Sequence, residues 1–317
     1  MAPAGRRPPA SPLSSPTSLD VVTPAYRGAC AIAQLLPGPV VDVLAPGTAE
    51  LAALRPGQRA QVERHQRRVD PSLRGGALRR RVREVFRSYG RYYGESFRLP
   101  TIAPEELDRR MTHEGYEHIE EARARGLGPL IVLPHLGSWE WCAYWLTRAK
   151  HVPVTAVVER LEPLALFDWF VEFRQRIGME IVPLGPDAGR SIVAAIKQAH
   201  VIALLCDRDI NGGGSEVTFF GERTTLPSGP AVLALRTGAP LLPTGVYDRD
   251  GRHHALVRPP IPAERQGTFR QDVARLTQAI ADELEGLIRL APEQWHLLQP
   301  NWPSDRTNDR GGDPQLP

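Results

Sequence analysis

A histidine and a glutamate that lie close together in the chain form the first candidate site. The segment reads Ile131-Val-Leu-Pro-His135-Leu-Gly-Ser-Trp-Glu140, so an apolar run ends at the histidine and a carboxylate follows it. A histidine at the end of a buried strand, oriented by a carboxylate, can take a proton from an alcohol. The pattern therefore indicates general-base chemistry of the kind that acyl transfer to a hydroxyl requires.

The spacing of His135 and Glu140 is useful only if the backbone turns between them. On one continuous helix, residues five apart are rotated by about 140° from each other. Gly137 and Ser138 stand between the two. Serine is a preferred N-cap, and the helix dipole favours a negative charge in the first turn. We expect His135 on a loop and Glu140 at a helix start, although both features are also common for purely structural reasons.

A second polar segment, residues 206–221, follows a later apolar run. Asp207, Asp209 and Asn211 match the opening positions of an EF-hand calcium loop. Thr218, however, stands where that loop needs a bidentate glutamate, and the preceding run is of β type rather than helical. We therefore predict no metal site here.

The same segment suggests a partner for His135. In open α/β sheets, ligands bind outside the carboxyl ends of the strands, and both His135 and this loop follow such ends. Glu216 could meet His135 there and hold its imidazole in the tautomer that accepts a proton. Arg208 and Arg174 could face a developing oxyanion or the phosphates of a donor, although most arginines are surface ion-pair partners.

Several common enzyme motifs do not occur in the sequence. It holds no G-x-S-x-G elbow, no P-loop and no G-x-G-x-x-G after a strand, which argues against a serine esterase, a nucleotide hydrolase and a dinucleotide enzyme. The three cysteines are far apart, so neither a disulfide framework nor a zinc pair is expected, and a reducing compartment fits. Cys142 and Cys206 lie in apolar runs that disfavour a reactive thiolate. Direct attack of a substrate hydroxyl on an activated acyl donor fits best.

The elements that must position these residues alternate along the second part of the chain. Six short runs rich in β-forming residues read as strands: 129–133, 152–158, 180–183, 200–205, 240–247 and 254–258. Five stretches between and after them read as helices: 139–148, 163–177, 188–198, 229–237 and 269–290. Such alternation predicts an α/β fold, a single domain with a central, mostly parallel sheet flanked by helices.

The first hundred residues are expected to form a helical layer on that sheet. Residues 1–20 and 304–317 read as disordered tails, and residues 21–303 as one domain, with a helical, membrane-facing part at 21–100 and an α/β core at 101–303. Prolines break the apolar stretch 25–54 into two helices too short to span a bilayer. They could lie on a membrane, or they could simply cap the core.

Positive charge is concentrated next to those helices. Residues 55–98 hold thirteen arginines against four acidic residues, whereas the whole chain has a net charge of only +3. Such a segment favours anionic lipid headgroups, a phosphate-rich donor or nucleic acid. A solvated helical face explains it equally well. Nucleic acid ranks last, because the aromatic residues in this segment have helical spacing that suits core packing.

Several linked segments resemble one known family. They are 89–100 (YGRYYGESFRLP), 134–140 (PHLGSWE), 158–163 (VERLEP), 207–209 (DRD), 216–221 (EVTFFG), 226–231 (LPSGPA) and 292–303 (PEQWHLLQPNWP). The histidine segment resembles the H-x4-D/E signature of the lysophospholipid acyltransferase superfamily, in its lipid A lauroyl/myristoyl branch. Together the segments look like the phosphatidylinositol mannoside acyltransferases of actinobacteria, over nearly the whole chain.

The resemblance implies a long-chain acyl transfer from acyl-CoA, such as palmitoyl-CoA, to a mannose of a phosphatidylinositol mannoside. It implies no bound cofactor, an anionic membrane surface and a glycolipid acceptor as partners, and a peripheral location on the cytoplasmic face of the plasma membrane. His135 would be the general base and Glu216 its orienting partner, with Glu140 shaping the site. Substrate contacts would come from these residues: Arg160, Arg174, Arg208, Ser228 and Gly229. Another lipid acceptor, such as a lysophospholipid, and a non-catalytic lipid-binding role remain alternatives.

Overall fold

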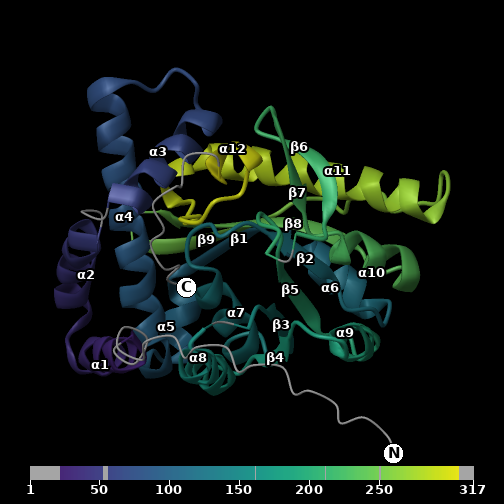
Figure 1. Cartoon of the computed structure of the whole chain (residues 1–317). Helices are drawn as coiled ribbons and strands as arrows, with labels where there is room; N and C mark the ends of the chain where they lie inside the picture. Colours follow the sequence, from purple (N-terminus) through teal and green to yellow (C-terminus); the bar gives the residue numbers. More distant parts are fainter. Residues whose placement is uncertain (1–21, 53–55, 161, 211, 250, 307–317) are drawn as a thin grey trace, which may run out of the picture.

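Seven strands form the central sheet of the protein (Figure 1). The structure is a computed structural model that describes residues 22–52, 56–160, 162–210, 212–249 and 251–306. The strands are β1 (Met111–Glu114), β2 (Leu130–Leu133), β3 (Val154–Val158), β4 (Glu180–Pro183), β5 (Val201–Leu205), β8 (Leu241–Arg249) and β9 (Arg252–Val257), in the order β1-β9-β8-β2-β5-β3-β4. Only the β8–β9 pair is antiparallel among these described strands. The predicted mostly parallel α/β fold is confirmed.

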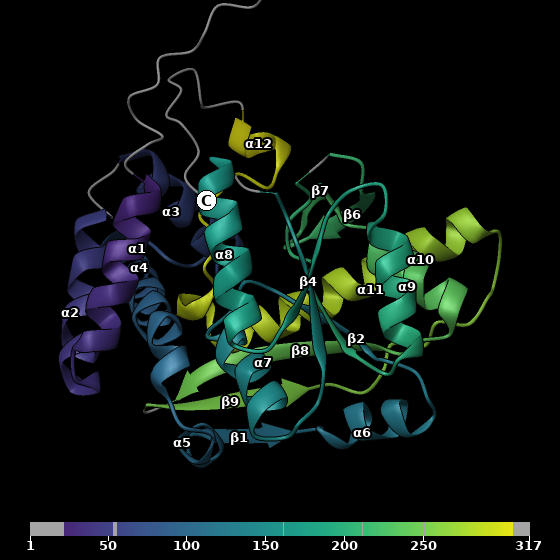
Figure 2. The ribbon, with the colours of Figure 1, turned by 90° about the horizontal axis from the view of Figure 1, so that it is seen from below.

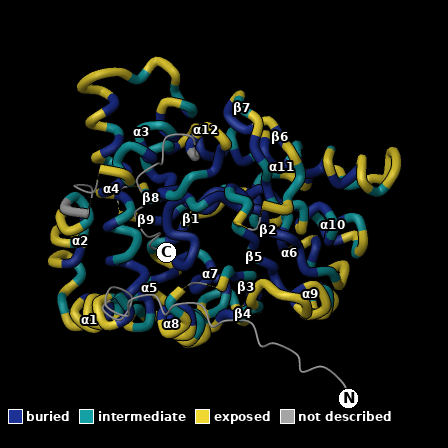
Figure 3. Tube along the Cα trace, viewed as in Figure 1, coloured by how far each residue is buried: buried dark blue, intermediate teal, exposed yellow. Residues whose placement is uncertain are grey.

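Side chains alternate between the two faces of the sheet, as the pleat of a strand requires. In β2, Leu130 and Val132 belong to the core on one face, whereas Ile131 and Leu133 belong to the core on the other. All four are buried, because helices cover both faces of the sheet at β2. This burial explains why the sequence of β2 is a continuous apolar run. Figure 3 shows the buried colour running through the strands and the exposed colour on the outer helices.

Helices from the second part of the chain cover both faces. One face packs against α7 (Trp139–Arg148) and α8 (Leu164–Arg176), and the other against α9 (Ala188–Lys197), α10 (Gly229–Thr237) and α11 (Phe269–Leu290). Figure 2 shows the sheet between these helices. The bounds of α7, α10 and α11 coincide with the predicted ones, and those of α8 and α9 differ at their ends by single residues.

Four N-terminal helices form a layer at one end of the sheet (Figures 1 and 2). They are α1 (Val22–Leu35), α2 (Gly38–Ala52), α3 (Pro56–Val69) and α4 (Gly75–Arg98). Helices α2 and α4 pack closely because Gly90 has no side chain: a Cβ there would clash with the carbonyl of Ala45. Helix α4 also contacts α7, which begins beside His135, so this layer reaches the candidate site. None of the helices in the described ranges is long and apolar enough to cross a membrane.

Some elements were not predicted from the sequence. The short helices α5 (Pro104–Arg109) and α6 (Glu117–Ala124) flank the edge strand β1, and 3-10 turns η1 (Leu99–Thr101) and η2 (Pro292–Gln294) connect longer elements. The stretch that reads as a loop after β5 contains a hairpin of β6 (Ser215–Phe219) and β7 (Glu222–Leu226), which forms a separate small sheet. Helix α12 (Pro303–Arg306) extends the fold past residue 303, since Asp305 is fully buried. Residues 1–20 and 307–317 of the two expected tails lie outside the described residues.

Candidate active site

The candidate site lies at the carboxyl ends of two neighbouring parallel strands. In the register of β2 and β5, Leu133 lies opposite Leu205. His135 and Asp207 each follow those residues by two positions, and the backbone N–H of Cys206 donates to the carbonyl of Leu133 at 2.9 Å, which extends the pairing. Strand register alone therefore brings the histidine and the aspartate together, at the sheet edge where ligands bind in open α/β folds.

Asp207 holds His135 through two contacts. Its Oδ1 lies 2.7 Å from Nδ1 of His135, and its Oδ2 accepts the backbone N–H of His135 at 3.0 Å. Burial raises the pKa of Asp207, but the charge of His135 and hydrogen bonds from His135 and Trp295 outweigh that effect, so the pKa lies below its usual value. Asp207 is fully buried and ionised, and it fixes Nδ1 of His135 as the protonated nitrogen.

The other ring nitrogen of His135 is then the one that can accept a proton. With Nδ1 donating to Asp207, the neutral ring carries its lone pair on Nε2. Among the described residues, no protein group is hydrogen-bonded to Nε2, and the side chain is 35% exposed where it lines a cavity of about 660 Å³. This is the arrangement of a histidine poised to take a proton from a molecule in the cavity.

The turn between His135 and α7 depends on Gly137. Its φ is +57°, and a Cβ at this position would clash with the carbonyl oxygen of Val246, so only glycine fits without a shift. Helix α7 begins at Trp139 after Ser138, as predicted, but Ser138 makes no side-chain cap. Its hydroxyl instead donates to Oε2 of Glu95 at 3.4 Å. The predicted helix start, with Ser138 at the N-cap position, is confirmed, although the serine side chain bonds Glu95 rather than the helix backbone.

Glu140 lies in the first turn of α7 but its carboxylate is turned to other partners. Its Oε1 accepts the hydroxyl of Tyr92 at 2.8 Å and the guanidinium of Arg174 at 3.0 Å, and the residue is 2% exposed. Burial raises the pKa of Tyr92 well above its usual value, and the charge of Glu140 raises it further, so Tyr92 stays protonated and donates. Glu140 therefore joins α4, α7 and α8 beside the cavity, rather than reaching His135.

Glu216 does not contact His135. It lies on β6, its side chain is 75% exposed, and its carboxylate pairs with Arg223 of β7 at 2.5 Å. The hairpin that carries Glu216 was read as a loop from the sequence, and the strand pairing turns this side chain to solvent. The carboxylate on the imidazole is Asp207, which corrects the expectation that Glu216 orients His135.

The five expected substrate contacts all line the cavity: Arg160, Arg174, Arg208, Ser228 and Gly229. Arg208 is held by Glu159 at 3.1 Å, and Arg174 by Glu140. Burial alone would lower the pKa of Arg174, but the charge of Glu140 outweighs it and raises the pKa. Apolar side chains form much of the remaining wall, among them Val158, Phe170, Ile192, Leu205 and Leu233. The cavity thus combines guanidinium groups with a surface for an apolar chain.

Three residues near His135 were not singled out from the sequence. Trp295 donates from Nε1 to Oδ2 of Asp207 at 2.8 Å, and Asn301 donates from Nδ2 to the carbonyl of Asp207 at 2.9 Å. The backbone N–H of His296 donates to the carbonyl of His135 at 2.7 Å. Their segment, 292–303, was noted only for its resemblance to a family. Asp207 was considered as a calcium ligand and noted in the segment 207–209 for its resemblance to the family, but not as a partner of His135, although its place after a predicted strand matched that of His135.

The cysteines have no place in this chemistry. All three are free and none of them pairs with another in the described structure. Burial raises the pKa of Cys142 to about 12, and burial together with the charge of Asp207 raises that of Cys206. Both thiols therefore stay protonated near neutral pH, which agrees with the expectation that neither is a nucleophile.

The chain is similar to known bacterial acyltransferases. Residues 18–304 match the family described as bacterial lipid A biosynthesis acyltransferase. The chain is 40% identical, over 228 residues and 70% of each chain, to the phosphatidylinositol mannoside acyltransferase of Mycobacterium tuberculosis. It is 35% identical over 232 residues to the protein of that name from Mycolicibacterium smegmatis, covering 72% of this chain and 74% of that one. It is 25% identical over 196 residues to the lipid A biosynthesis acyltransferase of Haemophilus influenzae, covering 60% and 58%.

Proposed function

Because the chain belongs to the bacterial lipid A biosynthesis acyltransferase family and is an acyltransferase, we propose that it transfers a long-chain acyl group from acyl-CoA to a mannose hydroxyl of a phosphatidylinositol mannoside. The observation that carries the chemistry is the His135–Asp207 contact of 2.7 Å, with His135 in the wall of a cavity lined by arginines and apolar residues. The names of two relatives that are 35% and 40% identical support the acceptor.

The reaction follows from the tautomer of His135. Nε2 takes the proton of the sugar hydroxyl as its oxygen attacks the thioester carbonyl carbon. When the tetrahedral intermediate collapses, the C–S bond breaks, an ester remains on the sugar, and the departing thiolate receives the proton from the imidazolium. Asp207 stays ionised throughout and stabilises the imidazolium, as the acid of a triad does. The sugar oxygen replaces the sulfur of CoA on the acyl carbonyl carbon in one direct transfer, so no protein nucleophile is needed.

The donor fits the side of the cavity formed by β3, β5 and α10. Arg160 and Arg208 there supply positive charge for phosphates, and Ser228 and Gly229 lie where α10 begins. The apolar wall suits an acyl chain, because each buried methylene contributes about 0.8 kcal/mol. The acceptor sugar would then lie beside Tyr89, Tyr93 and His296, which also line the cavity.

A membrane surface is the proposed location of the acceptor lipid. Five large apolar side chains in the described parts of α1 and α2 project into solvent: Ile32 at 59%, Leu35 at 84%, Val40 at 40%, Val43 at 75% and Leu44 at 53% exposure. Part of the neighbouring arginine cluster turns inward, since Arg64 and Arg68 pair with Asp305. Arginines on α4 remain exposed, including Arg79, Arg80 and Arg83. Apolar insertion together with attraction to anionic headgroups supports peripheral binding at the cytoplasmic face of the plasma membrane.

The function is tested by following both products with a panel of acceptors. Palmitoyl-CoA is mixed with phosphatidylinositol mannosides, a lysophospholipid or no acceptor; released thiol is measured with a chromogenic reagent, and the acylated lipid by mass spectrometry. We expect rapid release only with the mannosides, and a drop of at least about 100-fold for His135→Gln, since general-base catalysis contributes about 10²–10⁴-fold. His118→Gln, on α6, is the matched control and should retain the wild-type rate.

Two results would contradict parts of the proposal. Faster transfer to the lysophospholipid than to any mannoside would show that the proposed acceptor is wrong and that the proposed acyl-transfer reaction is right. Binding of the lipids without release of CoA thiol from palmitoyl-CoA in the presence of any acceptor would contradict the transfer reaction and favour a lipid-binding role. An acylated mannoside formed at equal rates by His135→Gln and the wild type would remove His135 as the base.

A further inference from the structure

A C-terminal segment, residues 295–305, packs against Asp207 and holds it by hydrogen bonds. Trp295 donates to Oδ2 of the carboxylate at 2.8 Å, and Asn301 donates to the carbonyl of the same residue at 2.9 Å. Asp207 thus has its side chain and its backbone bound by two residues of one segment, about ninety positions further along the chain. Both bonds are buried, where a fixed donor is worth more than in water.

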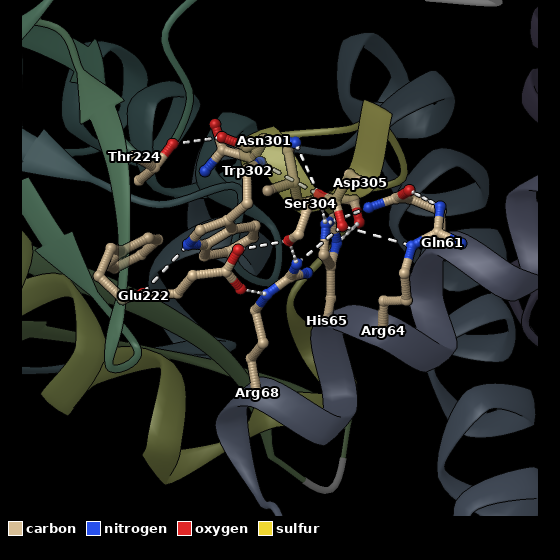
Figure 4. A network of polar contacts seen from close by, with 12 residues as sticks. Gln61, Arg64, His65, Arg68, Glu222, Thr224, Asn301, Trp302, Ser304 and Asp305 are labelled. Atoms are coloured by element: carbon tan, nitrogen blue, oxygen red, sulfur yellow. Dashed lines mark hydrogen bonds and ion pairs between the residues drawn. The ribbon is translucent and has the colours of Figure 1, made fainter. Parts of the chain in front are cut away.

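The segment is in turn anchored by a buried aspartate. Asp305 is 0% exposed, and its Oδ2 accepts the backbone N–H groups of Asn301 at 3.0 Å and Trp302 at 3.1 Å. Its carboxylate also pairs with Arg64 at 3.3 Å and with Arg68 at 2.9 Å, both on α3. Figure 4 shows these side chains of α3 converging on Asp305. A buried carboxylate with two guanidinium partners and two backbone donors has little freedom to move.

Helix α3 binds the segment at further points. Nδ1 of His65 lies 3.0 Å from the carbonyl of Leu297, and the amide of Gln66 donates to the carbonyl of Pro292 at 2.8 Å. The ring of His65 also stacks on Trp295, with centroids 5.4 Å apart. A chain of contacts therefore runs from α3, through the C-terminal segment, to the carboxylate that orients His135.

We propose that Trp295 and Asn301 are positioning residues for the His135–Asp207 pair, and that Asp305 fixes both against α3. The inference rests on the proposed role of His135 as the base. The carboxylate of Asp207 accepts the indole N–H of Trp295 and the backbone N–H of His135 on Oδ2, and it holds the imidazole on Oδ1, so its negative charge is shared among these donors. Removing the indole N–H leaves more charge for the imidazolium, so the protonated form of His135 is favoured and the base is active only at higher pH.

Other ionisable groups around the pair stay the same in such a variant. Glu159 of the cavity wall interacts with the charge of His135, as does His296, and Cys206 interacts with the charge of Asp207. Arg208 is held by Glu159. None of these groups lies on the indole N–H of Trp295, so a change on its removal reports the Trp295–Asp207 bond.

The test compares two tryptophans of the same segment. Trp295→Phe removes the N–H on Asp207 and keeps an aromatic ring against His65. Trp302→Phe is the matched control, because Nε1 of Trp302 donates to the carbonyl of Phe219 at 3.1 Å and not to Asp207. For each, kcat/KM is measured against pH, and the rate at which diethyl pyrocarbonate modifies His135 is followed against pH by peptide mass spectrometry. The second readout needs no acyl acceptor.

For Trp295→Phe we expect the acid limb of kcat/KM and the modification midpoint to move together to higher pH by about half a unit or more, with about a tenfold lower plateau. Trp302→Phe should leave both midpoints in place. Asn301→Ala should lower the plateau as well, and Asp305→Asn should show both changes if it remains folded by circular dichroism. Equal midpoints in Trp295→Phe and the wild type would overturn the proposal. If no acceptor is acylated, the proposed function is wrong. The rates of His135 modification still test whether Trp295 positions the His135–Asp207 pair.

Discussion

Nδ1 of His135 lies 2.7 Å from Oδ1 of Asp207, and both residues stand two positions beyond Leu133 and Leu205, which are paired across β2 and β5. The contact is therefore set by parallel strand register rather than by a mobile loop. A base positioned by the sheet needs little reorganisation during the reaction, which favours catalysis because orientation is established before the substrate arrives. Side chains of the surrounding helices complete the wall of the cavity that His135 lines.

The first prediction concerns the buried Glu140–Arg174 pair. Glu140→Gln removes the charge that compensates Arg174, whose side chain is 15% exposed. Breaking a buried pair on one side costs about 3–5 kcal/mol because a charge is left without a partner. We expect the free energy of unfolding in urea to fall by about 3 kcal/mol or more.

A double variant separates charge from shape at that pair. In Glu140→Gln with Arg174→Met, no uncompensated charge remains, so most of the lost stability should return. A double variant less stable than either single one would show that the pair is held for another reason. Because Tyr92 also donates to Glu140, Tyr92→Phe is a useful comparison and should cost less than the charge change.

The second prediction is a loss of stability in mild acid caused by His296. Burial first, and then the charge of His135, lowers the pKa of His296 from its ordinary 6.5 to about 3. Between those values the unfolded chain binds a proton that the folded protein does not. The stabilisation is therefore full above pH 6.5 and is lost as the pH falls towards 3, with about 2 kcal/mol lost by pH 5.

Urea unfolding at several pH values between 7.5 and 5 measures this effect. His296→Gln should show a shallower decline than the wild type over that range, whatever its stability at pH 7.5. The buried His65 has a lowered pKa in the folded protein too, mainly through burial, and contributes in the same direction in both proteins. Identical slopes for the variant and the wild type would show that His296 is not held neutral.

The third prediction concerns the apolar side chains of α1 and α2. Leu35→Ser with Val43→Ser should weaken binding to vesicles that contain anionic lipid by at least about tenfold, since a buried Leu or Val side chain contributes about 1.5–3 kcal/mol. Sedimentation of the protein with vesicles provides the measurement. Leu290→Ser is the matched control, because Leu290 is 56% exposed on α11, outside α1 and α2. Equal loss in the control would argue against a defined membrane face.

Sequence patterns predicted most of the sheet and its helices, for physical reasons. The apolar run of β2 and the bounds of α7, α10 and α11 follow from local preferences and burial on one or two faces. The edge strand β1 was missed because only Met111 of its four residues is buried, so it lacks an apolar pattern. The β6–β7 hairpin was missed because glycines and acidic residues precede it and resemble a loop.

Local sequence patterns predicted the position of His135 but not its partners. His135 could be chosen from its position after a strand, but its partner could not be chosen without knowing that β2 and β5 are neighbours in register. Glu216 looked equally suitable until strand pairing with β7 turned its side chain to solvent. Trp295 and Asn301 lie far along the chain, and no local pattern reveals that their segment folds back onto Asp207.

The central claim is that Asp207, not Glu216, makes His135 a base, and one comparison of two variants tests it directly. The initial rate of acyl transfer from palmitoyl-CoA is measured for Asp207→Asn and Glu216→Gln, with folding checked for both. Asp207→Asn keeps the shape of the side chain but removes its charge, and it favours the wrong tautomer, so we expect a loss of about 10²–10⁴-fold. Glu216→Gln, at a solvent-exposed side chain, should keep nearly the wild-type rate. A folded Asp207→Asn protein with near-normal activity, or an inactive Glu216→Gln protein, would contradict the account.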